Sequence, residues 1–552
     1  MAARLNAGSP SAVRPPHAVP ESVNALILFE DEHLLVVHKP SGINTHKPDR
    51  LAPDGLHEWL TRRKPSWRNL SVLHRLDKDT SGVLVFGKSS RANQSLAKQF
   101  AGHTIAKDYL LLAAARPTRQ RFCAKSTDGV TEFEFVGPHA GLFLVRARPV
   151  TGKTHQIRRH AADNGFPIVG DTLYGGEPAP RLMLHAHQIT LQHPGTGEPI
   201  TFEASVPRVF DELDSLVAAL EFRELIFNEQ TTAFRLISGA TDGFPDVVVD
   251  NYDGWLLVQW QTHEARAMSE RLVDALRTSA KPSGIIEQMV TRSERSAPRM
   301  LWPAGELPGK FMVQENGLTF WVQFGEGLST GLFADQRENR WRLLSMDLRG
   351  KTALNCFAYT GAFSLAAAKA GAMVTTVDLS RNYLEWCRDN FRANGLACDD
   401  SAPLPGANKD EKPRSLQQAS GQASQNPSKH DFIYGDVFDW LRRFAKRGRT
   451  WDLVLLDPPT FSKAKHGRAF QAERDYRDLA ALAVPLVAAD GWLFCSTNQR
   501  TLAPEKFERL LLDAAQQCGR VVTTLEFQTV PFDFRTPAGE LPYLKTFWAQ
   551  LR

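Results

Sequence analysis

The stretch Trp451–Lys463, WDLVLLDPPTFSK, carries the clearest structural signal in this chain of 552 residues. Leu453–Leu456 is an unbroken apolar run, which is typical of a parallel strand buried on both faces. Asp457, Pro458 and Pro459 follow, and because prolines cannot continue a ladder, the chain must leave the sheet there with a carboxylate. Ligands of open α/β sheets bind at this edge. A lone DPP would also fit an ordinary strand-to-loop exit, so the neighbouring segments decide between the two.

The sequence from residue 325 onward alternates between strand and helix patterns around this run. Strands are expected at Lys351–Phe357, Met373–Val377, Phe432–Tyr434 and Trp492–Ser496, and helices at Phe363–Ala370, Asn382–Asn394, Val437–Lys446 and Arg474–Ala488. A last helix near Glu505–Gln517 and two strands, Val521–Gln528 and Tyr543–Leu551, complete the series. This alternation predicts an α/β doubly wound, Rossmann-like parallel sheet.

Three acids end successive strands of this predicted sheet, and their order indicates the cofactor. Asp378 ends the second strand, where a carboxylate can accept from both hydroxyls of a ribose. Asp436 ends the third, where it could accept from the exocyclic amine of adenine. Asp457 ends the fourth. This layout resembles S-adenosylmethionine binding in class I methyltransferases.

The loop after the first strand supplies the other cofactor candidates. It runs from Asn355 to Gly361 and includes Phe357 and Tyr359. It is less glycine-rich than the usual fingerprint. A dinucleotide-binding dehydrogenase would need GxGxxG at this point, and that motif is absent from the sequence.

Bulk composition is that of a soluble globular protein, with 42% hydrophobic and 23% charged residues. No apolar run approaches the roughly 18 residues of a membrane span. The six cysteines form no CxxC pair, which argues against zinc or a disulfide framework and favours a reducing cytoplasm. A net charge of +5 permits a polyanionic partner without requiring one.

The first third of the chain contains a separate series of motifs. His74–Gly82 reads HRLDKDTSG, and in an extended chain Arg75 and Asp77 would point to one face. The later segments are KDY at 107–109, TGKTHQIRRH at 151–160 and GFPIVGDTLYG at 165–175. Any one of these could be structural, but their combination is specific.

In this order the motifs closely resemble the RluA family of pseudouridine synthases, over about residues 25–205. The resemblance implies an α+β domain with a mixed antiparallel sheet. It implies that Asp77 is the nucleophilic aspartate, that Tyr109 stacks on the target base, and that Arg158 is the partner of the aspartate. Arg75 is a further catalytic candidate within the motif.

These residue types suit the isomerisation of uridine. A carboxylate can act covalently without a cofactor, an adjacent arginine keeps it ionised and oriented, and an aromatic ring holds a flipped base. Whether Asp77 attacks the base, attacks the sugar or removes a sugar proton stays open.

Residues 325–552 resemble the RlmK/RlmI type of 23S ribosomal RNA methyltransferase. The matching segments are TGLFADQRENR, LNCFAYTGAFS, VDLSRNYLEW and LLDPPTFSKAK. The resemblance implies that Asp457, Pro458 and Pro459 face the substrate. Lys463, Lys465 and Arg468 directly follow that edge and are candidates for contacts with RNA phosphates.

The expected organisation has five segments. They are a disordered tail at 1–24, the pseudouridine synthase domain at 25–205, a helical linker at 206–222, a small α/β domain at 223–324, and the methyltransferase domain at 325–552. Within the last, residues 399–430 are rich in Ser, Gln, Pro, Asp and Lys, and we predict a disordered insertion.

The sequence therefore predicts a bifunctional enzyme that acts on large-subunit ribosomal RNA or the assembling subunit, with S-adenosylmethionine, no metal and no membrane. The alternatives are an assembly factor with decayed sites and a protein methyltransferase.

The segments VDLSRNYLEW and DPPTFS look nearer to the RlmK branch, which methylates guanine N7. A 5-methylcytosine enzyme is the other possibility, because Cys495 lies near the position where such an enzyme has its thiol. There, however, the cysteine follows the serine of this segment, whereas here Thr497 does.

Overall fold

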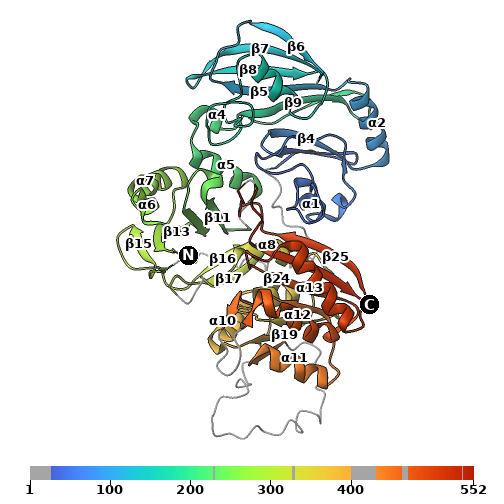
Figure 1. Cartoon of the computed structure of the whole chain (residues 1–552), viewed down its shortest axis with the longest axis vertical. Helices are drawn as coiled ribbons and strands as arrows, with labels where there is room; N and C mark the ends of the chain where they lie inside the picture. The colour runs from blue at the N-terminus through green and yellow to red at the C-terminus, as the bar shows by residue number, and fades with distance from the viewer. Residues whose placement is uncertain are drawn as a thin grey trace, which may run out of the picture.

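The computed structural model describes residues 26–127, 129–227, 230–291, 293–325, 330–398, 430–462, 470–537 and 539–552. The predicted tail, residues 399–429 of the predicted insertion, and Lys463, Lys465 and Arg468 lie outside this set. Figure 1 shows a sheet of the N-terminal part at the top, a smaller sheet at the left, and a third sheet with flanking helices below. No helix among the described residues is long and apolar enough to cross a membrane.

The N-terminal part is built on a mixed sheet of ten strands in the described residues. Its central order is β1-β2-β4-β9-β5-β8-β7-β6, with β3 beside β4 and β10 beside β9. The β4–β9 pair is parallel and the other pairs are antiparallel. The strands are β1 (Ile27–Glu30), β2 (Leu34–Lys39), β3 (Ser71–Val72), β4 (Ser81–Gly87), β5 (Ala106–Ala113), β6 (Arg121–Ser126), β7 (Gly129–His139), β8 (Leu142–Pro149), β9 (Leu184–Gln192) and β10 (Pro199–Glu203).

Short helices cover this sheet and lead out of it. They are α1 (Leu56–Thr61), η1 (Pro65–Trp67), α2 (Ser90–Ala101), α3 (Gln156–Asp163), α4 (Val209–Glu212) and α5 (Ser215–Ile226). α5 begins at an N-cap, Asp214, whose carboxylate accepts from two backbone amides of the first turn. The sequence predicted a helical connection in this region, and α5 continues it beyond residue 222.

The middle part contains a five-stranded sheet in the order β11-β12-β13-β14-β15. Its elements are β11 (Ala233–Ser238), η2 (Gly239–Asp242), β12 (Val247–Tyr252), β13 (Trp255–Trp260), α6 (His263–Arg266), α7 (Ser269–Ala280), β14 (Gly284–Met289) and β15 (Arg299–Trp302). The hairpin β16 (Phe311–Glu315) and β17 (Leu318–Val322) follows. The sequence pattern of residues 231–261 predicts the first three strands and that of His263–Ala280 predicts a helix, whereas β14–β17 were not expected.

The C-terminal part has a seven-stranded sheet in the order β20-β19-β18-β21-β24-β26-β25. The first five of these strands are parallel, but β26 runs antiparallel to β24 and β25 antiparallel to β26. The multidomain α/β prediction holds, and the expectation of a wholly parallel sheet is wrong at this end. The strands are β18 (Thr352–Cys356), β19 (Met373–Asp378), β20 (Asp431–Tyr434), β21 (Trp451–Leu456), β24 (Val487–Thr497), β25 (Val522–Thr529) and β26 (Lys545–Leu551).

Helices cover both faces of this sheet and create two cores. α9 (Ala362–Lys369) and α10 (Arg381–Ala393) pack on one face, in a core that continues into the hairpin β16–β17. α11 (Val437–Lys446), α12 (Ala472–Ala483) and α13 (Pro504–Gln517) pack on the other. The remaining elements are η3 (Ala334–Gln336), α8 (Arg337–Leu344), η5 (Val484–Leu486) and the two-residue strands β22 (Phe461–Ser462) and β23 (Phe470–Gln471). The predicted helix Arg474–Ala488 is shorter than expected, because the chain becomes η5 and then β24.

α8 is a buried helix that holds the N-terminal part against the C-terminal sheet. Arg63, just after α1, donates from Nη2 to both carboxylate oxygens of Glu338, at 2.6 and 2.7 Å. Its guanidinium lies between the rings of Trp59 and Trp341, at 4.3 and 4.7 Å. Trp341 Nε1 also donates to the carbonyl of Arg62 at 3.0 Å. The contact is therefore specific and buried, and it places α1 over α8 (Figure 1).

We predict that Glu338→Ala lowers the free energy of unfolding by about 3–5 kcal/mol, because it leaves a buried guanidinium without its carboxylate. Chemical denaturation followed by tryptophan fluorescence measures this change. Asp478→Ala is the matched control, since its pair with Arg477 is more than half exposed and worth about 1 kcal/mol or less. Equal stability of the two variants would show that the Arg63–Glu338 pair contributes little.

Candidate active sites

A cleft of about 660 Å³ opens over the N-terminal sheet, where the predicted pseudouridine synthase residues converge. Asp77 lies in the loop between β3 and β4, Tyr109 on β5 and Arg158 on α3, and all three line the cleft. Arg75 also lines it, with its side chain exposed, and donates to Thr154 Oγ1 at 3.0 Å. The four residues come from separate parts of the sequence, so the fold brings together what the motifs suggested.

Asp77 is the carboxylate at the centre of this cleft. Arg158 Nη1 and His155 Nε2 each lie 3.9 Å from its Oδ2, close enough for electrostatic stabilisation but longer than a hydrogen bond. Arg158 is instead bound bidentately by Asp171, at 2.6 and 2.7 Å. Asp171 therefore fixes the position of the arginine, and the carboxylate of Asp77 stays accessible. Asp171 lies within the motif GFPIVGDTLYG, but the sequence did not indicate that it binds Arg158.

Tyr109 is positioned beside Asp77 by strand pairing. β5 pairs with both β8 and β9, and β9 pairs in parallel with β4, which begins just after the Asp77 loop. Gly82 permits the close β4–β9 approach, because its φ is +120° and an added Cβ would collide with the carbonyl of Ala186. Burial and the neighbouring Asp77 raise the pKa of Tyr109, so its hydroxyl stays protonated. The half-buried ring then offers an apolar face to the cleft.

Lys39, the last residue of β2, binds the Asp77 loop, and no sequence motif marks it. The residue is fully buried, and its Nζ donates to three carbonyls, those of Pro40, Ile43 and Lys78, at 2.7–2.9 Å. Burial lowers the pKa of Lys39 to about 7, while three acceptors favour the ammonium form, which alone has three N–H donors. Lys39 thus ties the segment after β2 to the residue next to Asp77.

The second candidate site lies at the carboxyl edge of the C-terminal sheet. Cys356, at the end of β18, pairs with Leu456 of β21 on one side and Val377 of β19 on the other. Asp378, the last residue of β19, and Asp457, the first residue after β21, therefore both lie at this edge of the sheet. The predicted convergence of the strand ends is present in the structure.

The loop after β18 forms a cradle beside Asp378. Phe357, Tyr359 and Gly361 have φ of +59°, +51° and +78°, so the backbone turns sharply within five residues. An added Cβ at Gly361 would strike Cys387 of α10. Asp378 accepts from the backbone amide of Tyr359 at 2.8 Å, and burial raises its pKa. The cradle is thus built around one carboxylate.

The two remaining cofactor candidates differ in their surroundings. Asn355 is buried, donates from Nδ2 to Ser364 Oγ at 2.9 Å, and has an Oδ1 without a hydrogen-bond partner. Asp436 is exposed and caps α11, accepting from the amide of Asp439 at 3.2 Å. It lies two residues after β20, which ends at Tyr434 as the sequence predicted. A strained cradle, two carboxylates and an unpaired amide oxygen fit a ligand with a ribose, an adenine and an amino group.

Asp457 is held at the carboxyl edge of the sheet by the start of α8. Gln336 Nε2 donates to Asp457 Oδ1 at 3.2 Å and to Ser496 Oγ at 2.7 Å. Burial raises the pKa of Asp457 to about 6, so the carboxylate is mostly ionised at neutral pH. Pro458 is buried and Pro459 exposed, which directs the chain outward after the carboxylate. Sequence reasoning did not identify Gln336 as its partner.

Cys495 lies in β24, one residue before Ser496, and its side chain is on the sheet face that α11–α13 cover. Successive side chains of a strand face opposite sides of the sheet, and Cys495 packs in the core formed with α11–α13. Burial raises the pKa of its thiol, so the thiolate is disfavoured. Within the described residues, no group of three or more His, Cys, Asp or Glu side chains is arranged to hold a metal ion.

Comparisons with known proteins match the two sites separately. Residues 33–163 match a family described as RNA pseudouridylate synthase, and residues 235–403 match S-adenosylmethionine-dependent methyltransferase. The chain is 33% identical to YwbD of Bacillus subtilis over 353 residues, which are 61% of this chain and 80% of that protein. It is 31% identical to ribosomal RNA large subunit methyltransferase I of Aeromonas salmonicida over 57% of this chain and 74% of that protein. The crystal structure of SMU.776 complexed with SAH is similar with a TM-score of 0.51 and 25% identity, covering 65% of this chain and 86% of that one.

We predict that Lys39→Met lowers pseudouridine formation by roughly tenfold or more and leaves methylation unchanged. The methionine keeps the apolar length but leaves three buried carbonyls without a donor, which displaces the Asp77 loop. Single-turnover assays of both activities on the same RNA measure the change. Lys78→Met is the control, because that exposed lysine lies in the same loop. Similar losses in both variants would rule out a special role for Lys39.

Proposed function

Because this chain belongs to the S-adenosylmethionine-dependent methyltransferase family of ribosomal RNA large subunit methyltransferase I, and also contains a pseudouridine synthase domain, we propose that it modifies large-subunit ribosomal RNA in two ways. It isomerises a uridine to pseudouridine and methylates a base. The observation that supports this most is that each part has its own set of converging functional side chains, one around Asp77 and one around Asp378 and Asp457.

In the N-terminal site, Asp77 is the proposed nucleophile or base. Arg158, fixed by Asp171, places its positive charge 3.9 Å from the carboxylate of Asp77 and leaves that carboxylate accessible. Tyr109 stacks on the flipped uracil, and Arg75 at the rim contacts the RNA backbone. These roles leave the covalent route of Asp77 open, because the same geometry serves attack on the base, attack on the sugar, or proton removal.

We expect Asp77→Asn to abolish pseudouridine formation while methylation continues at the wild-type rate. The amide preserves size but is neither a nucleophile nor a base. Carbodiimide mapping of ribosomal RNA from cells that carry only this variant measures the first activity. Mass spectrometry of nucleosides from the same RNA measures the second. Pseudouridine at every wild-type position would refute the assignment.

In the C-terminal site, the cradle Phe357–Gly361 and the acids Asp378 and Asp436 are the proposed cofactor contacts. S-adenosylmethionine supplies an electrophilic methyl group on its sulfonium. Asp378 is suited to accept from the ribose hydroxyls, and the unpaired Oδ1 of Asn355 to accept from an ammonium. Asp457, Pro458 and Pro459 face the base. Lys463, Lys465 and Arg468 remain proposed phosphate contacts.

We further propose that guanine N7 is the methylated atom. Cytosine C5 needs addition of an enzyme thiolate first, whereas guanine N7 already carries a lone pair and needs only positioning. Cys495 is buried, points into a core, and has a raised pKa, so it is poorly suited to that addition. The carboxylate of Asp457 can accept from the guanine amino or N1 group during alignment.

Cys495→Ala is therefore expected to keep at least half of the methylation activity, with 7-methylguanosine as the product nucleoside. Purified full-length protein, S-adenosylmethionine and RNA from cells that lack this gene are sufficient for the assay. Cys495→Ser is a useful second variant, because it tests whether any loss comes from packing. Loss of activity in both variants, together with 5-methylcytidine from the wild type, would favour the cytosine alternative.

The proposal extends to the organisation of the chain. We propose functional segments at 25–205, 206–222, 223–324 and 325–552, and a cytoplasmic location, which the lack of a CxxC pair among the six cysteines supports. An assembly factor without catalysis is the second candidate. The buried, oriented partners of Arg158 and Asp457 argue against it, because decayed sites have no reason to keep paired polar groups in place.

A further inference from the structure

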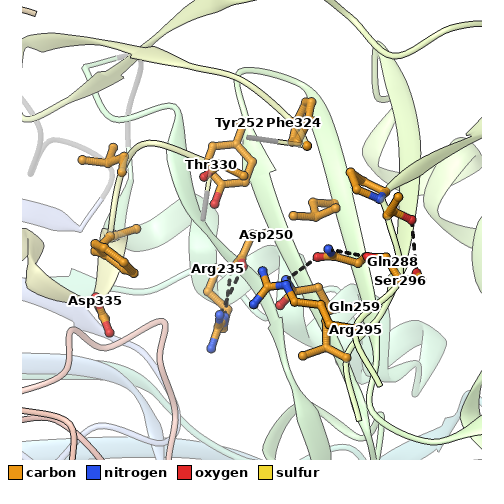
Figure 2. A pocket seen from close by; sticks show the side chains of 18 of the residues that line it. Arg235, Asp250, Tyr252, Gln259, Gln288, Arg295, Ser296, Phe324, Thr330 and Asp335 are labelled. Atoms are coloured by element: carbon orange, nitrogen blue, oxygen red, sulfur yellow. Dashed lines mark hydrogen bonds and ion pairs between the residues drawn. The ribbon is translucent and has the colours of Figure 1, made fainter. Parts of the chain in front are cut away.

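A cavity of about 580 Å³ lies between the middle sheet and the start of α8 (Figure 2). Its floor comes from β12, β13 and β14, and its walls include Phe324, Phe333 and Asp335. Phe534 and Tyr543, from the region between β25 and β26, close another side. No role in the two activities has been assigned to it so far. Its volume is in the range of small-ligand sites.

The cavity is next to the methyl-transfer edge but separate from it. Asp335 lines the cavity, and the following residue, Gln336, donates to Asp457. The ring of Phe333 lies 5.2 Å from that of Tyr359 in the cofactor cradle. Neither Asp457 nor Asp378 is among the lining residues. A ligand in the cavity would therefore neighbour the reacting base and not replace it.

Three of the four charged residues that line the cavity, Arg235, Asp250 and Asp335, are engaged by other side chains, which disfavours a phosphate as its occupant. Arg235 Nε donates to Asp250 Oδ1 at 2.9 Å, and its guanidinium lies 4.2 Å from the ring of Phe534. Asp335 accepts from the hydroxyl of Tyr543 at 2.8 Å. Burial raises the pKa of Asp335. A flat, neutral group with hydrogen-bonding edges fits this lining better than an anion does.

Two glutamines provide an oriented polar end. Gln288 Nε2 donates to the carbonyl of Ser296 at 2.9 Å, which fixes the orientation of that amide. Gln259 Nε2 then donates to Gln288 Oε1 at 3.4 Å, as the dashed lines of Figure 2 show. The fixed amide of Gln288 thereby sets the rotamer of Gln259, whose own oxygen can accept and second N–H can donate. An amide with an adjacent donor and acceptor matches the edge of a nucleobase.

Phe333 supplies an aromatic surface at the rim. Its side chain is 48% exposed, which is unusual for a phenylalanine in a loop between two buried segments. Its neighbours Leu332 and Gln336 are buried, so the loop is anchored while the ring remains accessible. Exposed aromatic rings in RNA-binding proteins typically serve as platforms on which single-stranded bases stack.

We propose that this cavity is a nucleobase subsite, which holds an unpaired base next in the RNA to the methylated one. Phe333 stacks on that base, and Gln259 contacts its hydrogen-bonding edge. This inference rests on the proposed RNA methylation. The occupied subsite would fix the register of the strand, so that one base only can reach Asp457.

Binding and methylation assays on large-subunit ribosomal RNA from cells lacking this gene test the subsite. In the full-length protein, Phe333→Leu is expected to weaken RNA binding by about tenfold, and Gln259→Met by about threefold to tenfold. Phe333→Tyr keeps the ring and should bind as the wild type does. Met268→Leu, at an exposed position between α6 and α7, is the surface control. The Kd for S-adenosylmethionine, measured by calorimetry, should not change in any variant.

Unchanged RNA affinity in both Phe333→Leu and Gln259→Met would overturn the inference. So would a weakened Kd for S-adenosylmethionine in Phe333→Leu with normal RNA binding, because Phe333 would then belong to the cofactor site through Tyr359.

A crosslinking experiment identifies the base directly. With p-benzoylphenylalanine at position 333, irradiation should join the protein to a nucleotide within about three positions of the methylated one, and primer extension locates it. Crosslinking to the methylated nucleotide itself, or no crosslink despite normal methylation, would refute the neighbouring subsite. Absence of methylation by the wild-type protein would instead refute the proposed function.

Discussion

The arrangement of this chain depends on α8, a helix whose polar side chains are buried and each paired in a different direction. Arg337, Glu338, Asn339 and Arg340 are at most 7% exposed. Glu338 binds the N-terminal part, Arg340 binds Glu315 of β16, and Asn339 accepts from Trp548 of β26 at 3.0 Å. Buried charges are costly unless their partners are well placed. The helix therefore fits one relative placement of the three sheets and opposes others.

The same helix connects this placement to the methylation edge. Gln336 immediately precedes α8 and orients Asp457, and Asn339 donates back to Gln336 Oε1 at 2.8 Å. A shift of α8 would thus disturb both the docking of the N-terminal part and the hydrogen bond that orients the carboxylate of Asp457. Fusion of two enzymes could in principle leave them independent. Here the contact between them, at Glu338, lies two residues from Gln336, which binds Asp457.

The features that the sequence predicted well are those set by residues close together in the chain. The strand ends at Asp378 and Asp457 follow from apolar runs and turn residues, which short-range patterns record. The site around Asp77 follows from the resemblance of its motifs to a known family. Lys39, Asp171 and the partners of α8 were not found, because their roles come from contacts between distant residues. The segment 337–344 reads RENRWRLL, and because five of its eight residues are polar or charged, it resembles an exposed helix. Only the folded chain shows that its charges are buried.

The end of the C-terminal sheet shows the same limit for topology. Alternating strand and helix patterns suggest parallel strands, but β25 and β26 follow one another without a helix and pair antiparallel. The chain between them carries Asp533, which binds Arg337 and accepts from the amide of Arg235 at 2.9 Å. It also carries Arg535, whose guanidinium lies against Gly42. The amide of Gly42 donates to the carbonyl of Lys78, beside Asp77. An antiparallel end therefore does more than close the sheet, because its connecting loop supports the segments on which both active sites are built.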